Sequence, residues 1–127
     1  MTKAEFAPWR KEKLGLKQPD ITAINWSLDH GLRIYVSDGI GQKPQLCIEF
    51  CLERSFRCTD EGYRLMSLPS LSENEVIWHT EDSEYLRQFR ADAATTMDNF
   101  PLIHWLIISA NQCVDVLCEQ EPKLSAL

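Results

Sequence analysis

The most apolar part of the sequence lies near its C-terminus and has the pattern of two adjacent β-strands. Leu102 to Ser109 and Gln112 to Cys118 are rich in β-branched and other large apolar side chains, and Ala110-Asn111 separates them. Asn tolerates the positive φ that a two-residue turn needs. This stretch therefore predicts a β-hairpin, with its first strand in the middle of a sheet.

The turn fixes the register of this hairpin and, with it, the two faces of the strands. Leu106 should face Asp115 and His104 should face Leu117, because side chains alternate along a strand. One face is then the core face: Ile103, Trp105, Ile107, Val114, Val116 and Cys118. The other face places His104 diagonally across from Asp115, about 7 to 8 Å away between backbones, which is within reach of the two side chains.

Alternating patterns upstream predict further strands. They are expected over Ile21 to Leu28, Leu32 to Ser37, Gln45 to Arg54, Phe56 to Asp60, Tyr63 to Leu68 and Glu75 to His79. The first two should pair as a hairpin around Asp29-His30-Gly31, and Phe56 to Asp60 should pair with Tyr63 to Leu68 as another around Glu61-Gly62. The side chains expected to face the core are Ile24, Trp26, Leu28, Leu32, Ile34, Val36, Leu46, Ile48, Phe50 and Leu52.

One segment has the features of a helix N-terminus. Thr80-Glu81-Asp82-Ser83 offers N-cap oxygens and acids, and an apolar stripe follows it, so a helix should run from here to near Thr95. Thr2 to Lys17 predicts a short helix broken at Pro8, and the residues after Pro122 should form a loose tail. The expected fold class is α+β: a mostly antiparallel sheet of six to eight strands, as a curved sheet or open barrel, with one firm helix.

The composition fits one domain over residues 1–127, with a basic segment at residues 1–18 that we expect to be loosely held. A net charge of −6 argues against nucleic acid as a partner, because phosphate binding needs a basic surface. Met1 to Asp20 has no apolar core of signal-peptide length, and the longest apolar runs elsewhere are far shorter than a membrane span. The cysteines number 5, and this odd count in apolar surroundings favours reduced thiols and a cytoplasmic location.

The candidate catalytic and metal-binding groups are few. On a strand, Cys47 and Cys51 would lie about 13 Å apart, and Cys113 and Cys118 would point to opposite faces, so neither pair predicts a metal site. No cofactor motif is present. His104 with Asp115 could form an acid–base pair in a pocket, which leaves open a small enzyme or ligand-binding protein.

The acidic stretch from residue 73 to 84 gives a different indication. Its carboxylates are interleaved with aromatic side chains, and the stretch contains no lysine or arginine. This composition is typical of a surface that binds a basic partner around aromatic anchors. The residues expected to contact that partner are Glu73, Glu75, Trp78, Glu81, Asp82, Glu84 and Tyr85. The same composition would also suit a solvated helix cap with Trp78 in the core.

Two parts of the sequence carry a resemblance to a known group of proteins. The first is Phe56-Arg57-Cys58-Thr59-Asp60-Glu61-Gly62, and the second is His104 to Ile108 with Asp115-Val116-Leu117. Both resemble small bacterial immunity proteins found beside secreted toxins. The resemblance implies a cytosolic inhibitor that binds one cognate toxin and has no catalytic residues. A basic toxin domain would suit an acidic inhibitor. The expected function is therefore protein binding, by a monomer or homodimer.

Overall fold

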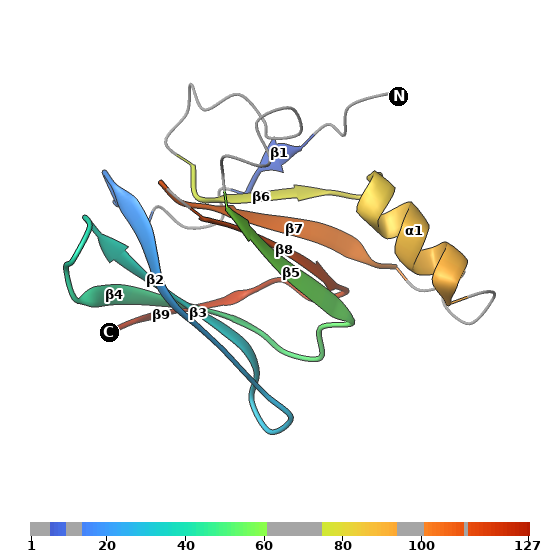
Figure 1. The fold of residues 1–127 in the computed structure, drawn as a ribbon, viewed down its shortest axis with the longest axis horizontal. Coiled ribbons are helices and arrows are strands. Elements are labelled where there is room, and N and C mark those ends of the chain that lie inside the picture. Colours follow the sequence, from blue (N-terminus) through green and yellow to red (C-terminus); the bar gives the residue numbers. More distant parts are fainter. Residues whose placement is uncertain (1–5, 10–13, 61–74, 94–100, 111) are drawn as a thin grey trace.

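Most of the chain is described by a computed structural model, over residues 6–9, 14–60, 75–93, 101–110 and 112–127. Within these ranges nine strands and one helix follow one another (Figure 1). They are β1 (Ala7–Pro8), β2 (Pro19–Ser27), β3 (Gly31–Asp38), β4 (Pro44–Phe50), β5 (Ser55–Asp60), β6 (Ile77–Thr80), α1 (Glu84–Asp92), β7 (Ile103–Ile108), β8 (Gln112–Cys118) and β9 (Lys123–Ala126).

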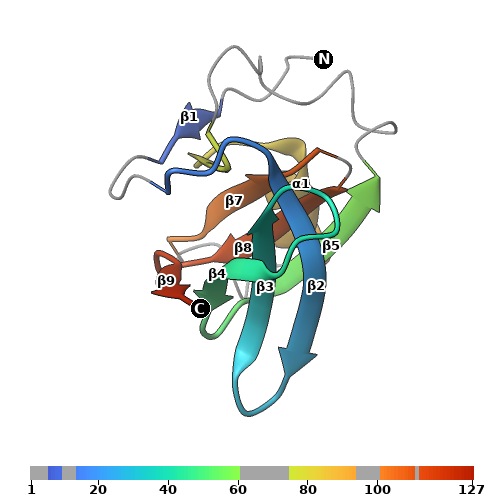
Figure 2. The same cartoon turned by 90° about the vertical axis from the view of Figure 1, so that its left-hand side faces the viewer.

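The strands form two sheets in which every pair of neighbours is antiparallel (Figures 1 and 2). One sheet has the order β1-β6-β7-β8-β5 and the other has the order β2-β3-β4-β9. The chain changes sheet three times: between β1 and β2, between β4 and β5, and between β8 and β9.

The two sheets share one apolar core. Ile34, Ile48 and Phe50 of the four-stranded sheet belong to the same buried cluster as Trp105 and Val116 of the five-stranded sheet. Burying each such side chain stabilises the fold by about 1.5 to 3 kcal/mol. This shared core joins the two sheets as two layers.

Helix α1 forms a third layer on the other face of the five-stranded sheet. Leu86 of the helix packs against Leu102 and Leu117, with Tyr85 and Phe89 at the margin of this cluster. Ser83 is the N-cap residue, and its hydroxyl accepts a hydrogen bond from the backbone N–H of Leu86. The capping that the sequence predicts is confirmed, and the helix ends at Asp92, before the expected Thr95.

The α+β class is confirmed, and so are two of the three expected hairpins. The third, around Glu61-Gly62, lies outside the described residues. In β7–β8, Leu106 faces Asp115 and His104 faces Leu117, as the turn at residues 110–111 predicts. In β2–β3, the side chains of Leu32, Ile34 and Val36 point into the core. Local turn chemistry and alternation were sufficient to set the register of β7–β8. In β2–β3 the turn lies at residues 28–30, one position before the expected 29–31, and Trp26 pairs with Leu32.

The expectation of one sheet was wrong, because the described strands divide between two sheets and form no closed barrel. Alternation along a strand shows which residues share a face, but it does not show at which loop the chain changes sheet. The strand expected at residues 63–68 lies outside the described residues.

Both ends of the chain also differ from the expectation. In place of a helix broken at Pro8, Ala7–Pro8 forms the short edge strand β1 beside β6. An edge strand accepts proline because it can turn its missing N–H away from the ladder. The expected tail after Pro122 contains β9, which pairs with β4.

Candidate functional site

The acidic stretch lies at the junction of β6 and α1, where short-range hydrogen bonds hold the backbone. The Thr80 hydroxyl accepts from the backbone N–H of Asp82 at 3.2 Å and donates to the carbonyl of Asp82 at 3.1 Å. Ser83 caps the helix at the next residue. The acidic side chains of this junction therefore extend from a fixed backbone.

The structure exposes some of the carboxylates that were expected to bind a partner. Glu81, Asp82 and Glu84 are exposed, and Glu75 is half-buried. Glu73 lies outside the described residues. The Asp82 carboxylate accepts a hydrogen bond from Arg87 at 2.5 Å, and both side chains remain largely in solvent. We call Glu81, Asp82 and Glu84 the acidic edge.

The two aromatic residues of this stretch are not presented to solvent as anchors. Trp78 is 4% exposed and packs with Leu106, as expected for the alternative in which Trp78 lies in the core. The Tyr85 ring is half-buried, its hydroxyl lies 2.5 Å from that of Ser55, and the Arg57 guanidinium sits 4.3 Å above the ring. Burial raises the pKa of the Tyr85 phenol.

His104 and Asp115 meet as the register predicts, but within a buried network. His104 Nε2 lies 2.6 Å from Asp115 Oδ1, and His104 Nδ1 lies 2.8 Å from Ser83 Oγ. Arg57 Nε donates to the other Asp115 oxygen at 3.1 Å. Because a carboxylate only accepts hydrogen bonds, Nε2 carries a proton in the pair with Asp115.

A serine, a histidine and an aspartate in contact suggest nucleophilic catalysis, but the geometry gives this set a structural role. Ser83 is 3% exposed, and its hydroxyl already accepts the N–H of Leu86 at the start of α1. The rings of Phe6 and Tyr85 pack edge-on against the imidazole, at 5.0 and 5.3 Å between ring centroids. A nucleophile needs access to its substrate, and this hydroxyl is enclosed.

The cysteines follow the expected pattern only in part, because Cys47, Cys113 and Cys118 are buried but Cys51 is half-buried and Cys58 is exposed. All 5 are free thiols. Cys113 and Cys118 belong to different buried clusters, which confirms that they point to opposite faces of β8. Among the described residues no group of three or more His, Cys, Asp or Glu side chains is placed to hold a metal ion.

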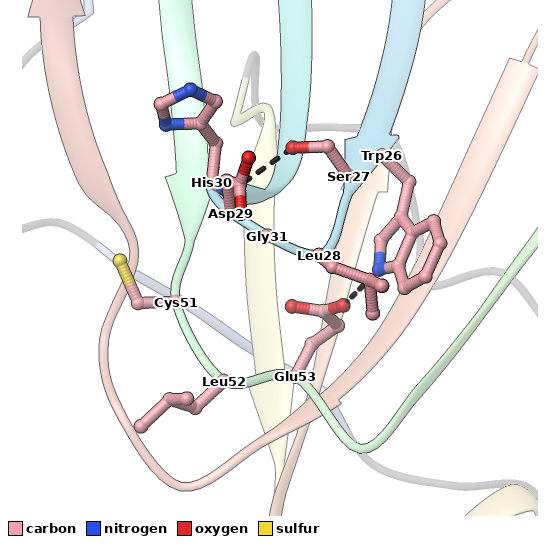
Figure 3. Close-up of a pocket in the computed structure, with 9 residues that line it drawn as sticks. All are labelled: Trp26, Ser27, Leu28, Asp29, His30, Gly31, Cys51, Leu52 and Glu53. Atoms are coloured by element: carbon pink, nitrogen blue, oxygen red, sulfur yellow. Dashed lines mark hydrogen bonds between the residues drawn. The ribbon is translucent and has the colours of Figure 1, made fainter.

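A hollow that the sequence did not predict lies at the turn between β2 and β3. It measures about 270 Å³ and is closed on one side by the connection between β4 and β5 (Figure 3). Its lining residues are Trp26, Ser27, Leu28, Asp29, His30, Gly31, Cys51, Leu52 and Glu53. The turn lies at the lower end of the molecule in Figures 1 and 2. We call this region the tip hollow.

Three large apolar side chains of the tip hollow are exposed, although alternation assigned them to the core. Trp26 is 49%, Leu28 is 90% and Leu52 is 70% exposed. The hairpin β2–β3 extends beyond the shared core at this end, and β4 stops at Phe50, before Leu52. The core-facing assignment of these residues was therefore wrong.

Two backbone features shape the tip hollow. Gly31 has φ +76°, and a Cβ atom at this position would lie 2.4 Å from the carbonyl oxygen of Phe50. Glycine is therefore required where the turn meets the end of β4. Leu52 has φ +59°, a conformation that a leucine rarely adopts, and the chain leaves the four-stranded sheet at this point.

No helix among the described residues is long and apolar enough to cross a membrane.

Comparisons with known proteins do not assign the chain to a family. The chain matches none of the family models, curated proteins or solved structures with which it was compared.

Proposed function

We propose that the protein binds and neutralises a basic polypeptide in the cytoplasm, as an immunity protein does with its cognate toxin domain. The observation that supports this proposal best is the acidic edge, where Glu81, Asp82 and Glu84 are exposed on a fixed backbone. Carboxylates held in this way attract a cationic surface before contact and exclude partners of the wrong charge.

The ion pair between Asp82 and Arg87 is compatible with such binding. Their side chains are 85% and 56% exposed, so water competes with the pair. Exposed ion pairs of this kind contribute about 0 to 1 kcal/mol. A partner's lysine or arginine can therefore replace Arg87 at little cost.

The helix dipole gives a second reason for acids at this junction, but it does not account for all of them. Glu84 lies in the first turn of α1, where a negative charge stabilises a helix. Glu81 precedes the N-cap residue by two positions and points into solvent. We therefore assign Glu81 to partner binding and use it as the test residue.

The test compares two charge reversals of equal size on the same protein. The full chain, tagged, is used to recover partners from its native cells, and the product of the gene immediately upstream is the first candidate. Glu81→Lys should abolish recovery of a basic polypeptide, and Asp92→Lys, at the other end of the helix, should leave it unchanged. Equal recovery by both variants, or no basic polypeptide with the wild type, would refute the proposal.

The salt dependence of binding supplies a second measurement on the same pair of proteins. Electrostatic steering raises the association rate most at low ionic strength, and it is screened over about 8 Å at physiological salt. The association rate of the wild type should fall steeply as salt increases. The Glu81→Lys variant should show a smaller dependence.

A further inference from the structure

The tip hollow combines exposed apolar area with negative charge. Trp26, Leu28 and Leu52 border it, and all three are exposed. Of its nine lining residues, Asp29 and Glu53 carry carboxylates, and none is a lysine or an arginine. An exposed tryptophan beside apolar neighbours is typical of a residue that anchors a protein partner.

The Glu53 carboxylate is held in position between Trp26 and the turn. Its Oε1 accepts a hydrogen bond from the Trp26 indole N–H. Its Oε2 lies on the side of the turn, 3.1 Å from the place that a Cβ on Gly31 would occupy. Figure 3 shows the carboxylate directed into the space between the turn and the indole. A carboxylate can accept several hydrogen bonds, so the bond to Trp26 leaves capacity for a cation.

We propose that the tip hollow binds an arginine or lysine side chain of the partner polypeptide. The cationic group would pair with Glu53, and it could lie over the face of the Trp26 indole, which attracts cations. Asp29 adds a second negative charge to the lining of the hollow. The methylene groups of the same side chain would contact Leu28 and Leu52. This inference takes from the proposed function only that the partner is a basic polypeptide.

The size of the hollow agrees with one side chain. Its volume of about 270 Å³ is below the range of about 300 to 1,000 Å³ that is usual for pockets holding whole small molecules. It is also open to solvent at its rim, where the lining residues Leu28 and Leu52 are exposed. A side chain that enters from a polypeptide lying across the turn fits both features.

The backbone of Leu52 gives an independent reason to assign a function to this hollow. The left-handed conformation costs a non-glycine residue about 1 to 2 kcal/mol, and a glycine would avoid this cost. The leucine side chain is 70% exposed, so burial in the folded protein offsets little of the strain. Backbone strain of this kind is concentrated at functional sites, where it holds a side chain in the position that binding requires.

The test uses three blocked tripeptides that differ in their central side chain: acetyl-Gly-Arg-Gly-amide, the lysine equivalent, and the citrulline equivalent, which has nearly the shape of arginine without its charge. Each is titrated into the full-length protein while NMR records the Trp26 indole N–H and the backbone amides of residues 27–31 and 51–53. The arginine or lysine peptide should cause saturable shifts at millimolar concentration. Equal shifts with the citrulline peptide, or no shifts with either cationic peptide, would overturn the inference.

Variants distinguish a specific site from general attraction between charges. Glu53→Gln keeps an acceptor for the Trp26 N–H but removes the charge, and it should weaken binding of the arginine peptide at least tenfold. Asp92→Asn removes a charge elsewhere and should bind as the wild type does. Unchanged binding by Glu53→Gln would overturn the inference. So would saturable binding of agmatine without binding of either cationic peptide, because it would indicate a free small cation.

The experiments distinguish a failure of the tip-hollow assignment from a failure of the proposed function. The peptide titration needs no natural partner and does not involve Glu81. A protein that binds its basic partner through the acidic edge but gives no response to the peptides would refute only the assignment of the tip hollow.

Discussion

His104 Nε2 lies 2.6 Å from Asp115 Oδ1, diagonally across the β7–β8 ladder. Asp115 is fully buried, and its second oxygen accepts a hydrogen bond from Arg57 on β5. The other imidazole nitrogen contacts Ser83 at the start of α1. One buried carboxylate thus joins β5, β7, β8 and, through His104, the helix whose N-terminus carries the acidic edge.

Removal of this carboxylate should destabilise the whole protein. Asp115→Ala leaves the buried His104 imidazole without its acceptor and also removes the partner of Arg57, whose side chain is 43% exposed. A buried donor left without an acceptor costs about 1 to 3 kcal/mol. The free energy of unfolding in urea measures the loss. Asp92→Ala, an exposed acid on α1, should change it by about 0.5 kcal/mol or less. Similar losses in the two variants would contradict the structural role of the network.

Ser83 should contribute through its hydroxyl group alone. Ser83→Ala removes the cap of α1 and the hydrogen bond to His104, and it should lower the free energy of unfolding by about 1 to 3 kcal/mol. Ser83→Thr keeps the hydroxyl and should recover most of this stability. Thermal unfolding of the two variants checks the difference. If threonine and alanine were equally destabilising, the hydroxyl would not be the relevant group.

The C-terminal hairpin and the contact between His104 and Asp115 could be predicted from the sequence, because both depend on local rules. The turn expected at residues 110–111 predicts the register that β7 and β8 have, and the register sets which side chains lie diagonally across the ladder. The participation of Ser83 was not predicted. It was expected as an N-cap residue, but only the packing of α1 on the sheet brings its hydroxyl to His104.

The tip hollow could not be predicted from alternation. Alternation places Trp26 and Leu52 on the face that points to the opposite sheet, but it does not show how far that sheet extends. In the structure the shared core ends before these residues, and the positive φ of Leu52 ends the regular strand. Trp78 shows the reverse case. Its place among acidic residues suggested a surface anchor, and the packing of β6 in the sheet buries it.

The ion pair between Arg33 and Glu49 should make stability depend on pH in the acid range. Arg33 Nε donates to Glu49 Oε2 at 2.7 Å, and this hydrogen bond holds the pKa of Glu49 below its ordinary value of 4.5. A pKa that is lower in the folded than in the unfolded state stabilises the fold above the unfolded pKa. The contribution is lost as the pH falls through the folded pKa.

The measurement for this pair is the free energy of unfolding in urea between about pH 6 and pH 3. The stability of the wild type should fall more steeply toward acid than that of Glu49→Gln. Arg33→Gln should flatten the slope in the same way, because it removes the donor that lowers the pKa. Wild-type slopes in both variants would show that the pair does not contribute.

Leu52→Gly should separate stability from binding. Glycine removes the strain of about 1 to 2 kcal/mol at the positive φ. Its greater freedom in the unfolded chain offsets about 0.5 to 1 kcal/mol of this gain. Since the exposed leucine contributes little burial, the variant should be about 0.5 to 1 kcal/mol more stable. It should also bind the arginine peptide more weakly, because it lacks the apolar contact at the tip hollow. Urea unfolding and the NMR titration on the same sample check both effects. A less stable variant would show that Leu52 is retained for packing.

Alanine variants of Gly31 and Gly15 separate two contributions to stability: the close approach of the turn to Phe50, and the strain of a positive φ. Both have a positive φ, +76° and +66°, but only at Gly31 would a Cβ atom meet a backbone atom, the Phe50 oxygen at 2.4 Å. Gly15→Ala should therefore lose about 1 to 2 kcal/mol from strain alone. Gly31→Ala should lose more, because the turn must also move away from the end of β4, and this movement should widen the tip hollow and weaken binding of the arginine peptide. Equal losses of stability in the two variants would mean that the turn adjusts freely and that the approach to Phe50 does not shape the hollow.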